Sequence, residues 1–515
     1  MIIPFAIIGA AWGAVVAWHY HRLGLTLTHY DARGHLVVAR RIFDSLTPGW
    51  QQIGAVWLPL PHLVNAVPVQ IDRFYRTGAS AVAISIVSFA IAVAAIAWIV
   101  QRVTGSLLAA IAGAAVFALN PNVLYLQATP MTEPLLLAAT TAAIAFLMAQ
   151  VSERSRDLRE TLASETPRRG ATWAFSESLS LRGRGLCGLL LALACLTRYE
   201  AWPVTAAAIA AVPAIRWWQR RSFTDGCREA AALALYPAVA IVGFAVFSRI
   251  VVGQWFVSGD FFVPENKALG DPAMALKEIG WGTQMLSGSL LAWIAGAGLV
   301  VLVVRTARRR DDASAILPVA LLAMAAVAWS AFYKGHPFRI RYMVPLMTVE
   351  AIGAGVLAGA VRSARASRSI AIAVLALTVY ELRPLDAQAP MVVEAQWDRP
   401  NLSARMRVTE CLADAPARGE KIMASMGSLG HYMQEASEQG FAIRDFLHEG
   451  NGDIWLAALD SPRPFADWIL IEEKAEGGDM LAKIARARPS FLEGYARVCE
   501  GAGLALYKRQ EYKRP

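Results

Sequence analysis

The chain has 515 residues, of which 56% are hydrophobic, with a mean hydropathy of +0.41 and a formal net charge of +9 at pH 7. Its apolar residues come in runs long enough to cross the roughly 30 Å of a bilayer core, which excludes a single soluble domain. Most of the excess arginine lies in short loops between these runs, where membrane orientation accounts for it, so no nucleic acid partner is expected.

The apolar runs predict a mainly α, polytopic helical membrane protein with about eleven spans. The first run has no small-residue cleavage site after it and is expected to remain as an anchor. Three runs are short enough to be tilted or partly re-entrant. The predicted spans are 2–18, 78–101, 104–121, 132–150, 185–199, 201–215, 229–252, 287–304, 314–333, 343–360 and 369–381.

Arginine-rich loops predict the orientation of these spans. They alternate with arginine-poor connections, so every rich loop falls on one side of the membrane. By the positive-inside rule the N-terminus and these loops are cytoplasmic, while residues 19–77 and 382–515 lie outside the cell membrane. The rich loops are 151–184, 216–228, 305–310 and 362–368.

The first outer loop is too long to be a simple connector. Within it, residues 33–46 place apolar side chains on one helical side and predict a helix lying in the membrane interface, stopped by Pro48 and Gly49. Its arginines, including Arg40, suit either lipid headgroups or a substrate. Residues 57–70 are apolar but interrupted by prolines, which predicts a re-entrant or surface segment.

The uncommon polar residues of the membrane part map to outer loops or to the outer ends of spans. Charges beside hydrocarbon are expensive, so their gathering at one surface indicates a functional site. These residues are Asp31, His35, Glu133, Arg198, Tyr199, Glu200, His336, Arg339, Arg341 and Tyr342.

Several segments over about residues 1–360 occur in a recognisable order. An acidic residue follows the first span, then come an amphipathic helix and the segments WLPLPH, TPMTEP, LTRYEAW and PFRIRYMVPL, before an outer C-terminal domain. This ordered set resembles the GT-C membrane glycosyltransferases of the family 39-like group, which includes protein O-mannosyltransferases and aminoarabinose transferases. The resemblance implies transfer of a sugar from a polyprenyl-phosphate carrier to an extracytoplasmic acceptor. The chain departs from the paired-acid pattern of that group because Ala32 follows Asp31, which puts a two-acid or metal-bridged site in doubt.

Sugar transfer from a lipid phosphate needs a carboxylate for the acceptor, cations for the departing phosphate and an apolar groove for the prenyl chain. Asp31 is predicted to be the general base, with N-capping of the 33–46 helix as its structural alternative. Glu133, in the Thr132-Glu133-Pro134 segment, either positions the acceptor or a basic residue, or serves only to start a helix.

Phosphate binding is assigned to clustered cations. Arg198 would hold a phosphate through two parallel hydrogen bonds, with a buried ion pair to Glu200 as the alternative. The segment 334–342 supplies further cations, which would contact phosphate or anchor two spans. The predicted substrate-binding residues are His35, Arg40, Arg198, Tyr199, Glu200, His336, Arg339, Arg341 and Tyr342.

No metal ligand set is assigned. His29, Asp31 and His35 do not present three ligands on one helical face, so a divalent metal would need ligands from elsewhere. The turn-rich loop 253–286 suits either a lid over the site or an ordinary connector.

The segment 382–515 is charged and interrupted by glycine and proline, which predicts a small extracytoplasmic α/β domain after the membrane domain 1–381. Strands are expected at KIMASM, DWILIEE and GLALYKR, and helices at GHYMQEA and MLAKIARA. Cys411 and Cys499 are its only cysteines, and they would pair in an oxidising compartment. The domain would select the acceptor or brace the outer loops.

Two other classes of protein remain open. A polyprenyl-lipid or glycolipid transporter would also be basic and multi-spanning, although it is expected to line a path at mid-membrane depth with charges. A noncatalytic membrane scaffold would leave Asp31 idle. The expected partners are a polyprenyl-phosphate sugar donor, membrane lipid, and an acceptor that is protein, lipid or glycan.

Overall fold

Helices dominate the fold. The computed structural model describes residues 2–510 except 55, 164–171, 252, 254, 256–265, 362 and 475–477, and it omits the side chains of 153–182 and 184. Helices make up 72% of the chain, and a small sheet lies near the C-terminus. The predicted class, mainly α with a small C-terminal α/β part, is confirmed.

In the described part of the chain, seven helical segments are long and apolar enough to cross a membrane, and a bent pair of helices makes up to eight. The total of eleven spans therefore stays a prediction. The seven are α1 (Ile2–Arg22), α5 (Ala79–Thr104), α8 (Glu133–Ala163), α11 (Phe223–Val251), α13 (Ser289–Arg308), η3 (Arg310–Met324) continued by α14 (Ala325–Tyr333), and η4 (Ile340–Leu346) continued by α15 (Met347–Ala358). The other helices of this part are α6 (Leu107–Ala118), α7 (Pro121–Gln127), α9 (Thr172–Cys195), α10 (Ala201–Trp218), α12 (Pro272–Ser287) and α16 (Ala364–Leu382).

The predicted span 104–121 is broken, because α6 and α7 meet at an angle of 67°. Asn120 caps α7, its side-chain oxygen accepting hydrogen bonds from the N–H groups of Asn122 and Val123. Pro121 takes the first position of the new helix. An N-cap followed by proline starts a helix in a new direction, so the chain turns here instead of crossing in one straight span.

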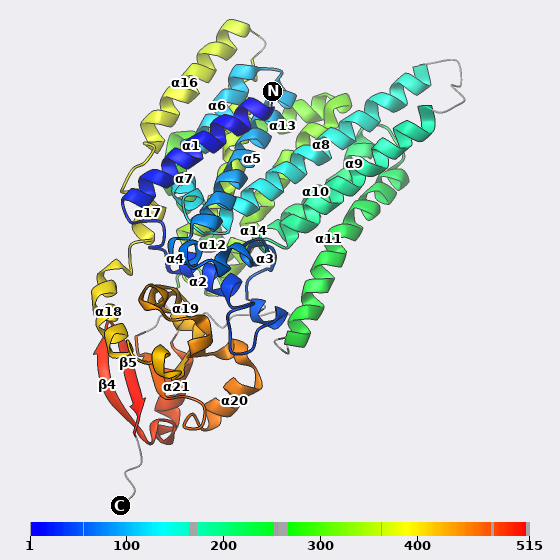
Figure 1. Ribbon diagram of the computed structural model, residues 1–515. Helices are drawn as coiled ribbons and strands as arrows, with labels where there is room; N and C mark the ends of the chain where they lie inside the picture. The colour runs from blue at the N-terminus through cyan, green and yellow to red at the C-terminus, as the bar shows by residue number, and fades with distance from the viewer. Residues whose placement is uncertain are drawn as a thin grey trace, which may run out of the picture.

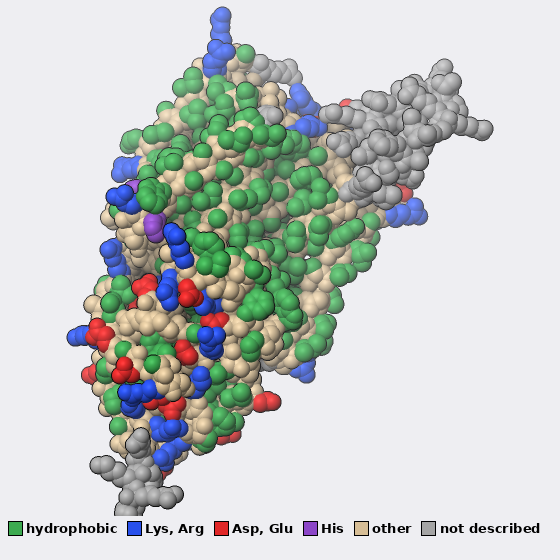
Figure 2. All heavy atoms as spheres, viewed as in Figure 1, with side chains coloured by type: hydrophobic (Ala, Val, Ile, Leu, Met, Phe, Trp, Pro, Cys, Tyr) green, Lys and Arg blue, Asp and Glu red, His purple; other side chains and the backbone are tan. Residues whose placement is uncertain are grey.

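The N-terminus and the C-terminal sheet lie at opposite ends of the molecule (Figure 1). Hydrophobic side chains cover the visible face of the helical part, whereas most charged side chains gather over the C-terminal part and at the far rim (Figure 2). This division fits a helical body in lipid with a C-terminal part in water. The cytoplasmic position of the N-terminus follows from the positive-inside rule alone and stays a prediction.

The C-terminal part is built around a five-stranded sheet in the order β2-β1-β3-β5-β4. β1 (Ile422–Ala424) pairs in parallel with β2 (Phe446–Leu447) and β3 (Trp468–Glu472), while β5 (Leu504–Arg509) is antiparallel to β3 and to β4 (Tyr495–Gly501). The three predicted strands and two predicted helices are confirmed, and β2 and β4 were not predicted. The helices are α17 (Pro390–Glu394), α18 (Leu402–Cys411), α19 (Met426–Ala436), α20 (Asp453–Asp460) and α21 (Met480–Ala487).

The helix of the first outer loop is α2 (Tyr30–Arg40), which is shorter than the predicted 33–46 helix and begins earlier. His29 is its N-cap, since the His29 ring accepts a hydrogen bond from the Asp31 N–H at 3.1 Å, so the N-cap reading of Asp31 is wrong. The predicted placement in the lipid interface is also wrong, because Leu36 and Val37 are buried in an apolar core shared with the C-terminal sheet. α2 is therefore an internal helix that packs against the C-terminal part.

The rest of the outer loops form short helices. The predicted non-spanning segment 57–70 contains α3 (Leu60–Asn65) and a short 3-10 turn, and α4 (Asp72–Thr77) follows. In loop 253–286 the second half is α12, capped by the side chain of Asp271. Residues 256–265 of that loop lie outside the described residues, so its role as a lid stays a prediction.

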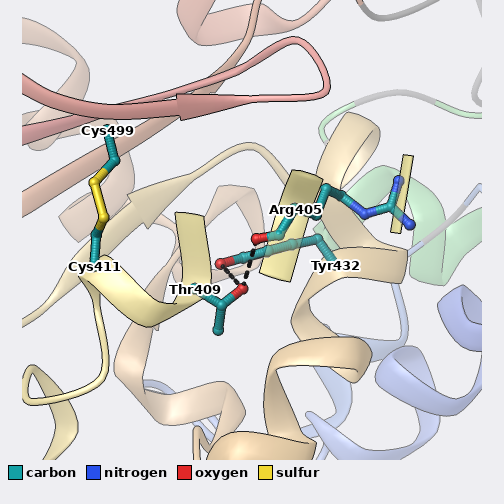
Figure 3. Close-up of a disulfide and its surroundings, with 5 residues drawn as sticks. All are labelled: Arg405, Thr409, Cys411, Tyr432 and Cys499. Carbon is teal, nitrogen blue, oxygen red and sulfur yellow. Dashed lines mark hydrogen bonds between the residues drawn. A yellow bond between two sulfur atoms is a disulfide. The ribbon is translucent and has the colours of Figure 1, made fainter. Parts of the chain in front are cut away.

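A disulfide joins Cys411, the last residue of α18, to Cys499 of β4 (Figure 3). Near it the Thr409 hydroxyl donates to the Arg405 carbonyl oxygen at 3.1 Å and accepts from the Tyr432 hydroxyl at 2.9 Å. The predicted pairing is confirmed. α18 is thereby fixed to the edge strand of the sheet on one side and to α19 on the other.

We expect replacement of Cys411 and Cys499 by serine to cost about 2–5 kcal/mol of unfolding free energy, because the bond closes a long loop in the unfolded chain. A sequence separation of 88 residues places it in the long-loop range. Denatured, unreduced protein should react with maleimide at three thiols, Cys187, Cys195 and Cys227, and reduced protein at all five. Equal labelling in the two states would contradict the bond.

Candidate functional site

The centre of the candidate site is an ion pair between the first outer loop and a late membrane segment. Asp31, in the first turn of α2, accepts a hydrogen bond from Nη1 of Arg341 in η4. The two residues are 310 positions apart in sequence, and both are buried. Nε of Arg341 is also buried and has no hydrogen-bond partner in the described part of the chain. This guanidinium therefore keeps a donor for a ligand.

The charge of Arg341 determines the protonation state of Asp31. Burial acts to raise the pKa of the Asp31 carboxyl, but the nearby guanidinium outweighs it and holds that pKa below its ordinary value. His29 and His35 act in the same direction as Arg341. Asp31 is thus ionised at neutral pH, and in this pairing it is a weak base.

A second buried cluster is centred on Arg198, in the turn between α9 and α10. Its guanidinium donates to Oε1 of Glu200 at 2.7 Å and to Oε1 of Glu133 at 2.9 Å. It also donates to Oγ1 of Thr132 at 3.0 Å. Glu133 is fully buried as the first residue of α8. The helix start at Glu133 and the ion pair to Glu200, both considered from sequence, are present together.

The two clusters form one electrostatic site. Burial alone would lower the pKa of Arg198, but Glu133 and Glu200 hold it above its ordinary value against the opposing charge of Arg341. Burial acts to raise the pKa of Glu200, and the charge of Arg198 reverses this. Arg198 and Glu200 are therefore ionised at neutral pH, and the charge of Arg341 acts on both of them.

Two buried histidines lie beside these charges. Nδ1 of His35 is 3.1 Å from Nε2 of His62 in α3, and Nδ1 of His62 is 3.2 Å from the Leu58 carbonyl oxygen. The Trp57 ring lies against the His35 ring, with centroids 4.2 Å apart. Burial and the neighbouring His62 hold the pKa of His35 well below its ordinary value, while burial and Arg41 lower that of His62 to about 3. Both rings are neutral at pH 7.

Other predicted residues border the site. The hydroxyl of Tyr342 is 3.2 Å from Nε2 of His336. Arg339 is buried, and its guanidinium lies over the Trp397 ring at 5.8 Å from the centroid. Tyr199 packs in an aromatic cluster with neighbouring rings. These residues frame the buried charges with aromatic surface.

Arg40 is placed elsewhere. It pairs with Asp44 at 2.9 Å and with Asp72 at 2.7 Å, and it lies over the Tyr75 ring at 4.5 Å. It stands nine residues along α2 from Asp31, about 13 Å at the helical rise. The structure does not bring Arg40 to the Asp31 cluster.

Several neighbours of the site were missed in the sequence. Trp57 and His62 stand in the WLPLPH segment, where two aromatic side chains among prolines gave a signal that was not used. His29 lies 3.7 Å from Oε1 of Glu394, in α17. Glu394 and Trp397 come from a stretch beyond the last predicted span, where no motif pointed to the site.

The described residues do not fit a divalent metal. They contain no group of three or more His, Cys, Asp or Glu placed to hold an ion. Asp31, Glu133 and Glu200 give their oxygens to guanidinium groups instead. The positive charges that these carboxylates contact in the described part of the chain are those of Arg341 and Arg198.

A small pocket of about 20 Å³, with room for about one water molecule, lies beside the charged clusters. His35, Asn65 and Thr132 contribute to its wall, which is otherwise mainly apolar, with side chains such as Leu36 and Met131. Thr132 also receives the hydrogen bond from Arg198, so the pocket reaches the second cluster.

Comparison with known proteins identifies the fold. No protein-family model and no curated protein matches the sequence. The crystal structure of ArnT from Cupriavidus metallidurans is similar at a TM-score of 0.58 and 12% identity, over 98% of both chains in the apo state and 97% of both when bound to undecaprenyl phosphate. The apo oligosaccharyltransferase of Archaeoglobus fulgidus has a TM-score of 0.53 at 10% identity, over 100% of this chain and 75% of that one.

The chain therefore has the GT-C fold of membrane glycosyltransferases, as the resemblance in sequence predicted. At these identities the shared property is the fold, and the roles of individual residues rest on the geometry of this chain.

We expect Arg198→Met to cost about 3–5 kcal/mol of unfolding free energy, because it leaves Glu133 and Glu200 buried without a cation. Adding Glu133→Gln and Glu200→Gln to it should recover much of the loss. Thermal unfolding in detergent measures both. Arg228→Met is the control, since Arg228 forms an exposed ion pair and should change little. Equal midpoints for Arg198→Met and the control would contradict the ionised cluster.

Proposed function

We propose that this chain is an integral membrane glycosyltransferase that moves a sugar from a polyprenyl-phosphate donor to an acceptor on the extracytoplasmic face. The observation that carries the proposal is Arg341 in a GT-C fold, a buried guanidinium that is paired with Asp31 and keeps an unused donor. The outer position of the site and of the C-terminal part follows from the positive-inside orientation.

The two arginines have different capacities for a phosphate. In the described part of the chain, Arg198 is held by two carboxylates and a hydroxyl, whereas Arg341 has a single carboxylate partner. A donor phosphate would therefore compete with Asp31 for Arg341, and Arg198 would add its field from a fixed position. Arg339 lies two residues from Arg341 and would add a third positive charge near the phosphate. Glu133 and Glu200 are positioning residues in this scheme.

Phosphate binding at Arg341 would release Asp31 for the acceptor. With its counter-ion engaged by the donor, the Asp31 carboxylate can accept the hydrogen bond of the acceptor hydroxyl. The acceptor oxygen then forms a bond to the sugar carbon as the bond from that carbon to the phosphate oxygen breaks. The electron pair of the broken bond stays on the phosphate, and a base of the site takes the hydroxyl proton. The arginines stabilise that charge, so a separate general acid is not required.

The test uses undecaprenyl phosphate that carries one radiolabelled sugar, with several different sugars tried in turn. Transfer is measured as radiolabel that enters acceptors of native membranes. We expect Asp31→Asn to lower kcat by about 10²–10⁴-fold. The same variant should bind undecaprenyl phosphate at least as tightly as wild type in a thermal-shift assay, because the competitor for Arg341 has lost its charge. Arg341→Lys keeps the charge but not the planar fork, so it should raise the KM for the donor.

Asp72→Asn is the matched control, a carboxylate of the same outer loop that pairs with Arg40 at the surface. It should leave transfer unchanged. Loss of both transfer and lipid binding in Asp31→Asn would indicate misfolding and remove the support for its role. Lipid bound by the wild type and moved across vesicles without sugar transfer would favour a transporter, and neither activity would favour a scaffold. Mass spectrometry of co-purified lipid identifies the carrier independently.

A further inference from the structure

The buried pair His35 and His62 has a fixed arrangement of hydrogens. A carbonyl oxygen only accepts, so Nδ1 of His62 carries the hydrogen that is shared with Leu58, at 3.2 Å. A neutral His62 then has a lone pair on Nε2, which accepts from Nδ1 of His35 at 3.1 Å. His35 is left with a lone pair on Nε2, and in the described part of the chain no group donates to it. The backbone thus dictates the tautomer of His35 through His62.

The surroundings of His35 hold that ring in place. Trp57 lies against one face, and Gly34 allows this close approach, since a Cβ at position 34 would lie 3.0 Å from the Trp57 ring. His35 also lines the small pocket, and so does Thr132, which accepts a hydrogen bond from Arg198. A ring with fixed orientation and an unpaired lone pair at a pocket wall is arranged to receive a proton.

We propose that Nε2 of His35 takes the proton of the acceptor hydroxyl, and that His62 is a positioning residue that holds this lone pair available. This inference rests on the proposed sugar transfer. The acceptor oxygen forms a bond to the sugar carbon, the bond from that carbon to the phosphate oxygen breaks with its electron pair on the phosphate, and the hydroxyl proton moves to His35. The imidazolium then returns the proton to water.

Asp31 and His35 are one helical turn apart on α2, so a hydroxyl bonded to the Asp31 carboxylate lies on the same face as His35. Asp31 is held ionised by Arg341 and is a weak base, whereas Nε2 of His35 has no competing partner among the described residues. In this division Asp31 orients the acceptor, and its negative charge stabilises the imidazolium that forms.

The charges around His35 couple its basicity to the donor. The titratable and charged groups that face it are His62 of α3, Asp31 of α2, Arg198 after α9 and Arg341 of η4. Both arginines disfavour a protonated His35. A donor phosphate offsets their charge, so the pKa of His35 rises when the donor is bound and His35 becomes an effective base only then.

The experiment compares His35→Gln, His62→Gln and His62→Leu by kcat, donor KM and the pH dependence of transfer, with the undecaprenyl-phosphate sugar probe. His35→Gln should lower kcat by about 100-fold or more at unchanged donor KM, with the residual rate rising steadily with pH. His62→Gln should stay near wild type, since its amide can donate to Leu58 and accept from His35. His62→Leu, of similar size, should lose about tenfold or more in kcat.

His21→Gln, at an exposed position of α1, is the control and should match wild type. A wild-type pH profile in His35→Gln, or equal losses in His62→Gln and His62→Leu, would overturn the inference while sugar transfer by the wild type upheld the proposed function. Nitrogen NMR of labelled histidine adds a readout without turnover. A tautomer of His35 with hydrogen on Nε2 in the wild type would overturn the inference directly.

Discussion

The arrangement of this protein depends on one constraint, the burial of a short helix that carries charges. α2 has 11 residues, and its Asp31, Arg33 and His35 each need a partner because an unpaired buried charge or polar group is costly. The partners come from three separate parts of the chain. They are Arg341 from a membrane helix, Glu435 from the C-terminal part and His62 from α3. The pairing of these three side chains of α2 therefore fixes the first loop, the membrane body and the C-terminal part relative to one another.

The C-terminal part packs against α2 and supports it. Arg33 donates to Glu435 at 2.6 Å, and Glu435 in turn receives Arg405 at 3.0 Å. Arg405 is in α18, which the disulfide fixes to the sheet. Alternate residues of β3 face two different apolar cores, and the core that contains Trp468 also contains Leu36 of α2. The predicted boundary at residue 382 separates chain segments, whereas the packing unit joins α2 to the sheet, which supports the bracing role.

The sequence predicts the helices and strands of this fold better than the contacts that each of them makes. Apolar runs identify the long helices, and the ordered motifs bring Asp31, Arg198 and Arg341 to attention. An amphipathic helix has the same sequence pattern whether its apolar side contacts lipid or protein, so the pattern alone favours the membrane interface for α2. The predicted helix extended to residue 46 because Phe43 continued the pattern, yet Phe43 is exposed. The role of His62 depends on a contact across 27 residues that no local pattern encodes.

The two central arginines, Arg198 and Arg341, differ in how many of their hydrogen-bond donors have partners. Arg198 makes hydrogen bonds to three neighbouring side chains and is built as a fixed positive charge, whereas Arg341 holds one carboxylate and keeps a buried donor unused. An unused buried donor costs stability, so its presence favours a ligand that supplies the missing acceptor. Among the described residues, the carboxylate that such a ligand would displace is Asp31, on the same helical face as His35. In the proposed reaction, anion binding at Arg341 and acceptor activation on α2 would thus be linked through a single ion pair, and the arrival of the donor would govern when the acceptor is deprotonated.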